Sequence, residues 1–137
     1  MGARELWLVG HGESVANVAA AEAELAGWNG IVVDFSDADV PLAATGQRQA
    51  DALGGGLTTN STGGPLASVW PSPYCRARQT IEFALERANS ETEVGVDERL
   101  RDRGLGILDL ASSTTGRRVE KWCIREQESL RMKFAQL

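Results

Sequence analysis

A short apolar run that ends in a histidine between two glycines constrains the fold of this chain most. Residues 6–9 read Leu-Trp-Leu-Val, and Gly10, His11 and Gly12 follow directly. The run is typical of a buried strand, and the glycines are typical of a tight exit from it. His11, the only histidine of the sequence, would then lie at the carboxyl end of a strand, where open parallel sheets bind their ligands.

Helix signals follow the histidine turn. Ser14 is a favourable N-cap, residues 15–26 are rich in alanine, and Gly27 is a typical C-terminal stop. We therefore expect a helix over residues 15–26. Residues 28–40 have no regular pattern and are predicted to form a loop.

A second helix is expected over residues 46–53. Thr45 is its predicted cap, and the three consecutive glycines at 54–56 are its predicted end. The glycine, serine and threonine residues of 58–64 are typical of a flexible loop.

Strand and helix patterns alternate through the rest of the chain. Residues 66–70 and 93–96 are predicted strands, and residues 76–88 and 119–134 are predicted helices with one apolar face. Such alternation indicates an α/β fold with a parallel sheet, and we expect one domain over residues 1–137. Its core is expected to contain the four tryptophans, Trp7, Trp28, Trp70 and Trp122.

Composition narrows the classes of function. The formal net charge of −5 argues against broad nucleic-acid binding, which needs a basic surface. No apolar segment approaches the roughly 20 residues that span a membrane, and no signal sequence is evident, so a cytoplasmic location is expected. Cys75 and Cys123 do not have metal-ligand spacing, and His11 and Glu13 lack convincing further ligands, so no metal site is predicted.

Two turns that carry arginines accompany the histidine. Residues 72–80 lie between a predicted strand and a predicted helix, so Arg76 is expected near a helix N-terminus, which favours anions. Its guanidinium adds a planar fork that matches phosphate oxygens. Residues 99–104 form the second turn and include Asp102. A histidine nucleophile, an arginine and a carboxylic acid together suit phosphoryl transfer through a phosphohistidine.

Three motifs, in this order, resemble those of the histidine phosphatase superfamily, also called phosphoglycerate mutase-like. They are Gly10-His11-Gly12-Glu13 with Asn17, Pro41-Leu42 with Gly46 and Gln49-Ala50, and Ser72-Pro73 with Arg76-Ala77 and Thr80. Their order and spacing agree with the family over about residues 5–106.

The resemblance implies a three-layer α/β sandwich with a mostly parallel sheet. It implies that His11 is the phosphorylated nucleophile, that Arg76 binds phosphate, and that Asp102 stands at the position of the proton donor. It also implies a site without a cofactor or a metal. The residues expected to line the phosphate and substrate pocket are Gly10, Gly12, Glu13 and Asn17.

Two departures from the family concern residues of the site. The family has an arginine where this chain has Gly10, and losing such a charged donor typically costs on the order of 100- to 1,000-fold in rate. The family usually has a glutamate where this chain has Asp102, which is one methylene shorter. A misplacement of about 1 Å can cost roughly 100-fold.

Two further departures concern the carboxyl-terminal part. The family has a second histidine there, and this chain has none. The strand that carries it in the family is also missing, so the resemblance predicts a domain without its carboxyl-terminal strands, truncated after about residues 110–137. Residues 6–9 would then expose unpaired backbone on at least one side.

These features leave three hypotheses open. The first is a phosphomonoesterase with impaired activity that acts on a small phosphate ester through His11. The second is a catalytically inactive pseudoenzyme that binds phosphate or dimerises. The third is a homodimer in which the open sheet pairs with a second copy.

A mutase is disfavoured because it needs a fuller basic pocket. A serine hydrolase is disfavoured because Ser14 lies in no Gly-x-Ser-x-Gly turn.

Overall fold

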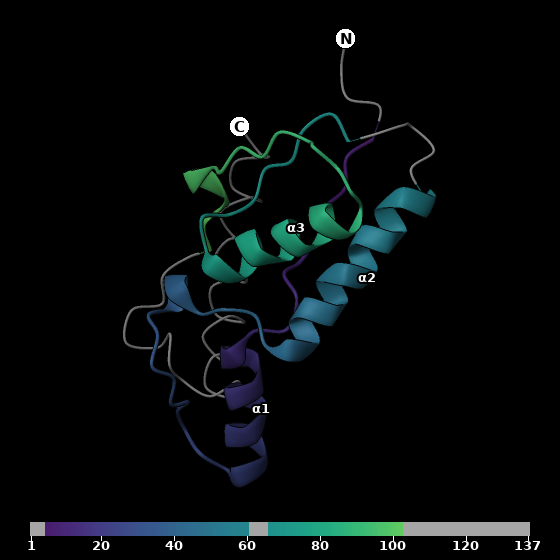
Figure 1. The fold of residues 1–137 in the computed structure, drawn as a ribbon. Helices are drawn as coiled ribbons and strands as arrows, with labels where there is room; N and C mark the ends of the chain where they lie inside the picture. The colour runs from purple at the N-terminus through teal and green to yellow at the C-terminus, as the bar shows by residue number, and fades with distance from the viewer. Residues whose placement is uncertain (1–4, 61–65, 103–137) are drawn as a thin grey trace, which may run out of the picture. The chain divides into compact units, whose positions relative to one another are not determined.

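The computed structural model describes residues 5–60 and 66–102. The chain divides into two compact units, residues 1–18 with 34–103 and residues 19–33 with 104–137. The described elements are helices α1 (Val15–Ala26), α2 (Ala44–Asn60) and α3 (Cys75–Arg87), with the short 3-10 helices η1 (Asp37–Asp39) and η2 (Glu98–Leu100) (Figure 1). None of the helices in these ranges has the length and apolar character needed to cross a membrane.

Local capping signals set both ends of α1, as predicted. At its start, the backbone N–H of Asn17 donates to Ser14 Oγ at 3.2 Å, and the Ser14 N–H donates to Asn17 Oδ1 at 2.9 Å. This reciprocal pair is a capping box with asparagine in the acidic position. At its end, Gly27 has a φ of 71°. The Gly27 and Trp28 N–H groups donate to the Glu24 and Ala23 carbonyls in a Schellman motif.

Helix α2 is longer than predicted, because it begins at Ala44 and continues through the three glycines to Asn60. Thr45 therefore lies inside the helix and is not its cap. Helix packing explains the glycines, since α2 packs against α3 (Figure 1). A Cβ at Gly54 would lie 2.3 Å from the Ala84 carbonyl oxygen of α3. Gly54 thus permits close approach of two helices, and this packing overrides its helix-ending tendency.

Helix α3 matches its prediction to within one residue at each end. It runs from Cys75 to Arg87, and Ala88 forms its C-cap. Thr80, Ala84 and Leu85 are buried along one face, as expected of an amphipathic helix.

The predicted strands form only in part. Residues 69 and 94 make a parallel bridge, in which Val69 N–H donates to the Glu93 carbonyl and Gly95 N–H donates to the Val69 carbonyl. The bridge is parallel, as expected of the predicted sheet, but it joins one residue pair, and residues 66–70 and 93–96 otherwise have no strand structure. The strand predicted at residues 6–9 is wrong, because these residues have no strand structure and Leu6 and Leu8 are 80% and 89% exposed. No segment of the described part pairs with them, and a lone segment cannot form a hydrogen-bonded ladder.

The expectation of tryptophans in the core is also wrong where the structure describes them. Trp7, Trp28 and Trp70 are exposed. The buried apolar side chains are smaller and come mainly from α2, α3 and the segment before α2: Ala23, Val40, Leu42, Ala50, Tyr74, Ala84 and Leu85. Trp122, Cys123 and the helix predicted over 119–134 lie outside the described residues. The single domain over 1–137, truncated after about 110–137, stays a prediction.

Candidate active site

His11 is exposed, and its ring is held by the backbone of the next residue. Its Nδ1 lies 2.7 Å from the Gly12 carbonyl oxygen. A carbonyl oxygen only accepts hydrogen bonds, so Nδ1 must carry the proton and donate. In the neutral ring, Nε2 then keeps an unshared electron pair. This arrangement suits a nucleophile, because Nε2 keeps its electron pair on an exposed side chain.

A hydroxyl group joins the histidine turn to helix α3. The buried Gly12 N–H donates to Thr80 Oγ1 at 3.0 Å, and that hydroxyl donates to the Arg76 carbonyl oxygen at 2.7 Å. Thr80 is buried and lies one helical turn after Arg76. Its hydroxyl therefore fixes the backbone beside His11 relative to the helix turn that carries the arginine.

The other side of the histidine turn packs on the start of α2. A Cβ at Gly12 would lie 2.5 Å from the Gly46 carbonyl oxygen, and a Cβ at Gly46 would lie 2.1 Å from the Glu13 carbonyl oxygen. Only glycine allows backbones to approach this closely. Gln49 Oε1 also accepts the Glu13 N–H at 2.7 Å. The second motif of the sequence thus supports the backbone next to His11.

Replacing Thr80 with valine tests this support. The buried Gly12 N–H would lose its acceptor, so we expect a loss of about 1–3 kcal/mol in the free energy of unfolding. Thr58→Val is the matched control, because the exposed Thr58 hydroxyl donates only to the Gly55 carbonyl of its own helix. Denaturant titration measures both variants. Equal losses would contradict the role assigned to Thr80.

Arg76 is held at one end of its guanidinium. Its side chain is 10% exposed, and Nη1 lies 3.1 Å from Asp37 Oδ1 and donates to the Asp37 carbonyl oxygen at 2.5 Å. The guanidinium carbon also lies 4.7 Å from the centre of the Tyr74 ring, a cation–π distance. Within the described residues, no hydrogen-bond partner occupies the Nε–Nη2 edge. Such a guanidinium edge has the geometry to bind two oxygens of a phosphate, and phosphate binding by Arg76 stays a prediction.

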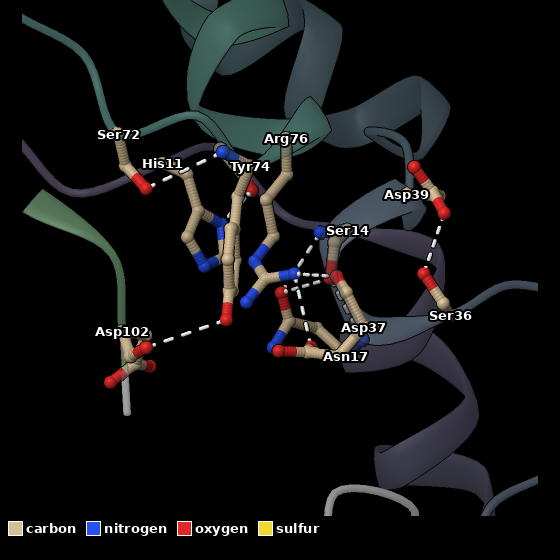
Figure 2. Close-up of polar contacts among 11 residues, drawn as sticks. His11, Ser14, Asn17, Ser36, Asp37, Asp39, Ser72, Tyr74, Arg76 and Asp102 are labelled. Atoms are coloured by element: carbon tan, nitrogen blue, oxygen red, sulfur yellow. Dashed lines mark hydrogen bonds and ion pairs between the residues drawn. The ribbon is translucent and has the colours of Figure 1, made fainter. Parts of the chain in front are cut away.

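Figure 2 shows that the side chains of His11, Tyr74 and Arg76 point the same way. The Tyr74 hydroxyl donates to the backbone carbonyl of Asp102 at 3.4 Å (Figure 2). Asp102, the predicted proton donor, is exposed, and this contact places its backbone at the hydroxyl end of Tyr74. Thr80 and Tyr74 thus connect the backbone at Gly12, the helix turn of Arg76 and the backbone of Asp102. The catalytic roles of His11, Arg76 and Asp102 stay predictions.

The predicted pocket residues differ in what their side chains do. Asn17 Oδ1 accepts hydrogen bonds from the Ser14 N–H and hydroxyl, so the side chain caps α1 (Figure 2). Gly10 is exposed, and a Cβ there would have no atom within 4 Å. Glu13 is half-buried, and its backbone is fixed by Gln49 and Ala43. Contacts of these residues with a substrate stay predictions.

The turn before Asp102 carries two arginines in different surroundings. Asp97 caps η2 and pairs with the exposed Arg99, whose side-chain and backbone hydrogen bonds lower the pKa of the Asp97 carboxyl to about 2. Arg101 lies over Tyr74, with its guanidinium carbon 5.5 Å from the ring centre. A hydrogen bond to the Tyr74 side chain, followed by the nearby charge of Glu98, raises the pKa of Arg101.

Sequence reasoning missed Asp37 and Tyr74, which hold the guanidinium of Arg76. Asp37 was one of three aspartates in a predicted loop, and nothing in the sequence distinguishes it from its neighbours. Tyr74 carried a weak signal, because an aromatic residue two positions before an arginine at a helix start is suited to stack on it.

Among the described residues, no group of three or more histidine, cysteine or acidic side chains is arranged to hold a metal ion.

Comparison with known proteins adds independent information. A family model for the histidine phosphatase superfamily (branch 1) matches residues 6–133. The chain is similar to a solved protein from Escherichia coli assigned as an alpha-ribazole-5'-P phosphatase, with 20% identity, a TM-score of 0.55, and coverage of 82% of this chain and 50% of that one. It is also similar to a protein from Nakamurella multipartitia assigned as the phosphohistidine phosphatase SixA, with 22% identity, a TM-score of 0.43, and coverage of 69% and 41%.

The chain therefore spans half or less of the length of these solved proteins. No curated protein sequence matches it. The likeness to the Escherichia coli protein confirms the α/β part of the fold prediction. The three-layer arrangement and the missing carboxyl-terminal strands stay predictions.

Proposed function

Because the chain belongs to the histidine phosphatase superfamily (branch 1), we propose that it is a phosphomonoesterase that hydrolyses a small phosphate ester through His11. The contact between His11 Nδ1 and the Gly12 carbonyl oxygen carries this proposal. It fixes the tautomer that leaves Nε2 as the nucleophile, on an exposed side chain that a substrate can reach.

In the first proposed step, the Nε2 electron pair attacks phosphorus and the bond from phosphorus to the ester oxygen breaks. The Nε–Nη2 edge of Arg76 binds two of the phosphoryl oxygens and offsets their charge. Asp102, in its protonated form, donates a proton to the leaving oxygen, which departs as an alcohol.

In the second proposed step, water attacks the phosphohistidine and the phosphorus–nitrogen bond breaks. The Asp102 carboxylate accepts a proton from the water, inorganic phosphate leaves, and His11 recovers its neutral ring. Gly10, Gly12, Glu13 and Asn17 are proposed to surround the bound ester, with Gly10 leaving open space where a larger side chain would stand.

Trapping the phosphorylated enzyme tests the proposal. A 32P-labelled phosphate ester is mixed with the protein, the reaction is stopped in alkali, and the peptides are mapped. A phosphohistidine survives alkali and is lost in acid, and the sequence has only one histidine. We expect the label on the peptide that contains His11. Alkali-stable label on any other peptide, or turnover without any label, would contradict this mechanism.

A second candidate is an inactive module that binds phosphate. The observation that favours it is Gly10, because the site has no charged side chain directly before His11. This alternative predicts that phosphate or vanadate raises the melting temperature while no label is trapped and no ester is hydrolysed.

A further inference from the structure

The Tyr74 ring brings two cations to one aromatic side chain. Tyr74 is 6% exposed. The guanidinium carbon of Arg76 lies 4.7 Å from its ring centre, and that of Arg101 lies 5.5 Å from it. Arg76 comes from the start of α3, whereas Arg101 directly follows η2. The ring therefore fixes the relative position of two arginines from segments far apart in the sequence.

Arg101 can exchange its present partner for a ligand. Its side chain is 52% exposed, and its carboxylate partner Glu98 is 72% exposed at 3.4 Å. Exposed ion pairs of this kind contribute little to stability and are screened by salt. At equal distance, a doubly charged phosphate group attracts Arg101 more strongly than the singly charged Glu98 does.

The site also needs a second positive charge. The charge of Arg76 is offset by Asp37 at 3.1 Å, and Gly10 brings none. A phosphate ester carries up to two negative charges near neutral pH. An additional cation over the Tyr74 ring, such as Arg101 next to Asp102 in the sequence, would supply attraction that Arg76 alone does not.

We infer that Arg101 is a second anion-binding side chain of the His11 site, positioned with Arg76 by the shared Tyr74 ring. This inference rests on the proposed function, since it assigns a further ligand for the phosphate ester. Arg101 attracts and holds the anion, while the reaction at His11 proceeds as described above.

The test compares Arg101→Gln with Arg99→Gln. Both arginines are exposed, flank Leu100 and pair with a local carboxylate, but the cation–π contact with Tyr74 belongs to Arg101. Calorimetry with inorganic phosphate measures binding without any reaction. We expect Arg101→Gln to weaken phosphate binding about tenfold, the effect of losing one charged hydrogen bond. Arg99→Gln should bind like the unaltered protein.

Steady-state kinetics with 4-nitrophenyl phosphate give a second measure. Arg101→Gln should raise KM about as much as it weakens phosphate binding, with kcat changed less than about twofold, and should make binding less sensitive to salt. Equal phosphate affinities for the two glutamine variants would overturn the inference. If phosphate binding depends on Arg101 but no phosphohistidine forms, the inference stands and the proposed esterase activity fails. A protein that binds no phosphate would contradict both.

Discussion

Alanine at position 11 is expected to eliminate hydrolysis of an aryl phosphate, with a loss on the order of 10⁴-fold or more. The sequence contains no other histidine, so no second imidazole can replace the nucleophile. The side chain is exposed and its hydrogen bond is with the adjacent residue, so we expect the free energy of unfolding to change by less than about 0.5 kcal/mol.

The measurement is release of 4-nitrophenol by matched preparations of the two proteins, with thermal melting as the control for folding. Equal rates in the unaltered and alanine proteins would exclude His11 as the nucleophile. Phosphate binding should survive in the alanine variant, because Arg76 keeps its contacts with Asp37 and Tyr74.

Arginine in place of Gly10 is expected to raise kcat/KM, by up to about 100- to 1,000-fold if its guanidinium reaches the phosphoryl oxygens. The structure gives two reasons why the substitution is tolerated. A Cβ at Gly10 has no atom within 4 Å, and Gly10 is not in the left-handed region that favours glycine.

Two control variants distinguish the effect of the added positive charge on kcat/KM from the effect of the added side-chain volume. Gly10→Gln adds a shorter polar side chain without the charge, and it should give a much smaller gain. Gly55→Arg introduces the same side chain at another open position, within α2, and should leave the rate unchanged. Equal gains from Gly10→Gln and Gly10→Arg would show that positive charge at position 10 is not what the site lacks.

The parts of the fold that the sequence predicted are those set by neighbouring residues. Helix α1 is bounded by the Ser14 cap and Gly27, and both signals act within one turn. The end of α2 was mispredicted because the role of Gly54 depends on Ala84, thirty positions away. The strand at 6–9 was mispredicted because a strand forms only when a second segment pairs with it. The composition of residues 6–9 does not show whether such a segment is present.

The residues of the candidate site also fall into those that the sequence could predict and those that it could not. His11 and Arg76 were predicted from motifs, because phosphoryl transfer restricts which residues can do the chemistry, and their roles stay proposals. Asp37 and Tyr74 could not, since they act by holding Arg76 and their value depends on distances of a few ångströms across separate segments. Asp102 was predicted from its position in the sequence, and its role as an acid stays a proposal.

The backbone contact between the His11 turn and helix α2 also limits how this protein can vary. A methyl group at Gly12 or at Gly46 would overlap the main chain of the other segment. A larger residue at either position cannot be accommodated by a smaller residue at the other, because both are already glycine and have no side chain to shorten. We therefore expect substitutions in the turn that carries His11 to be tolerated at Gly10, where a Cβ has open space, and not at Gly12 or at Gly46 of α2.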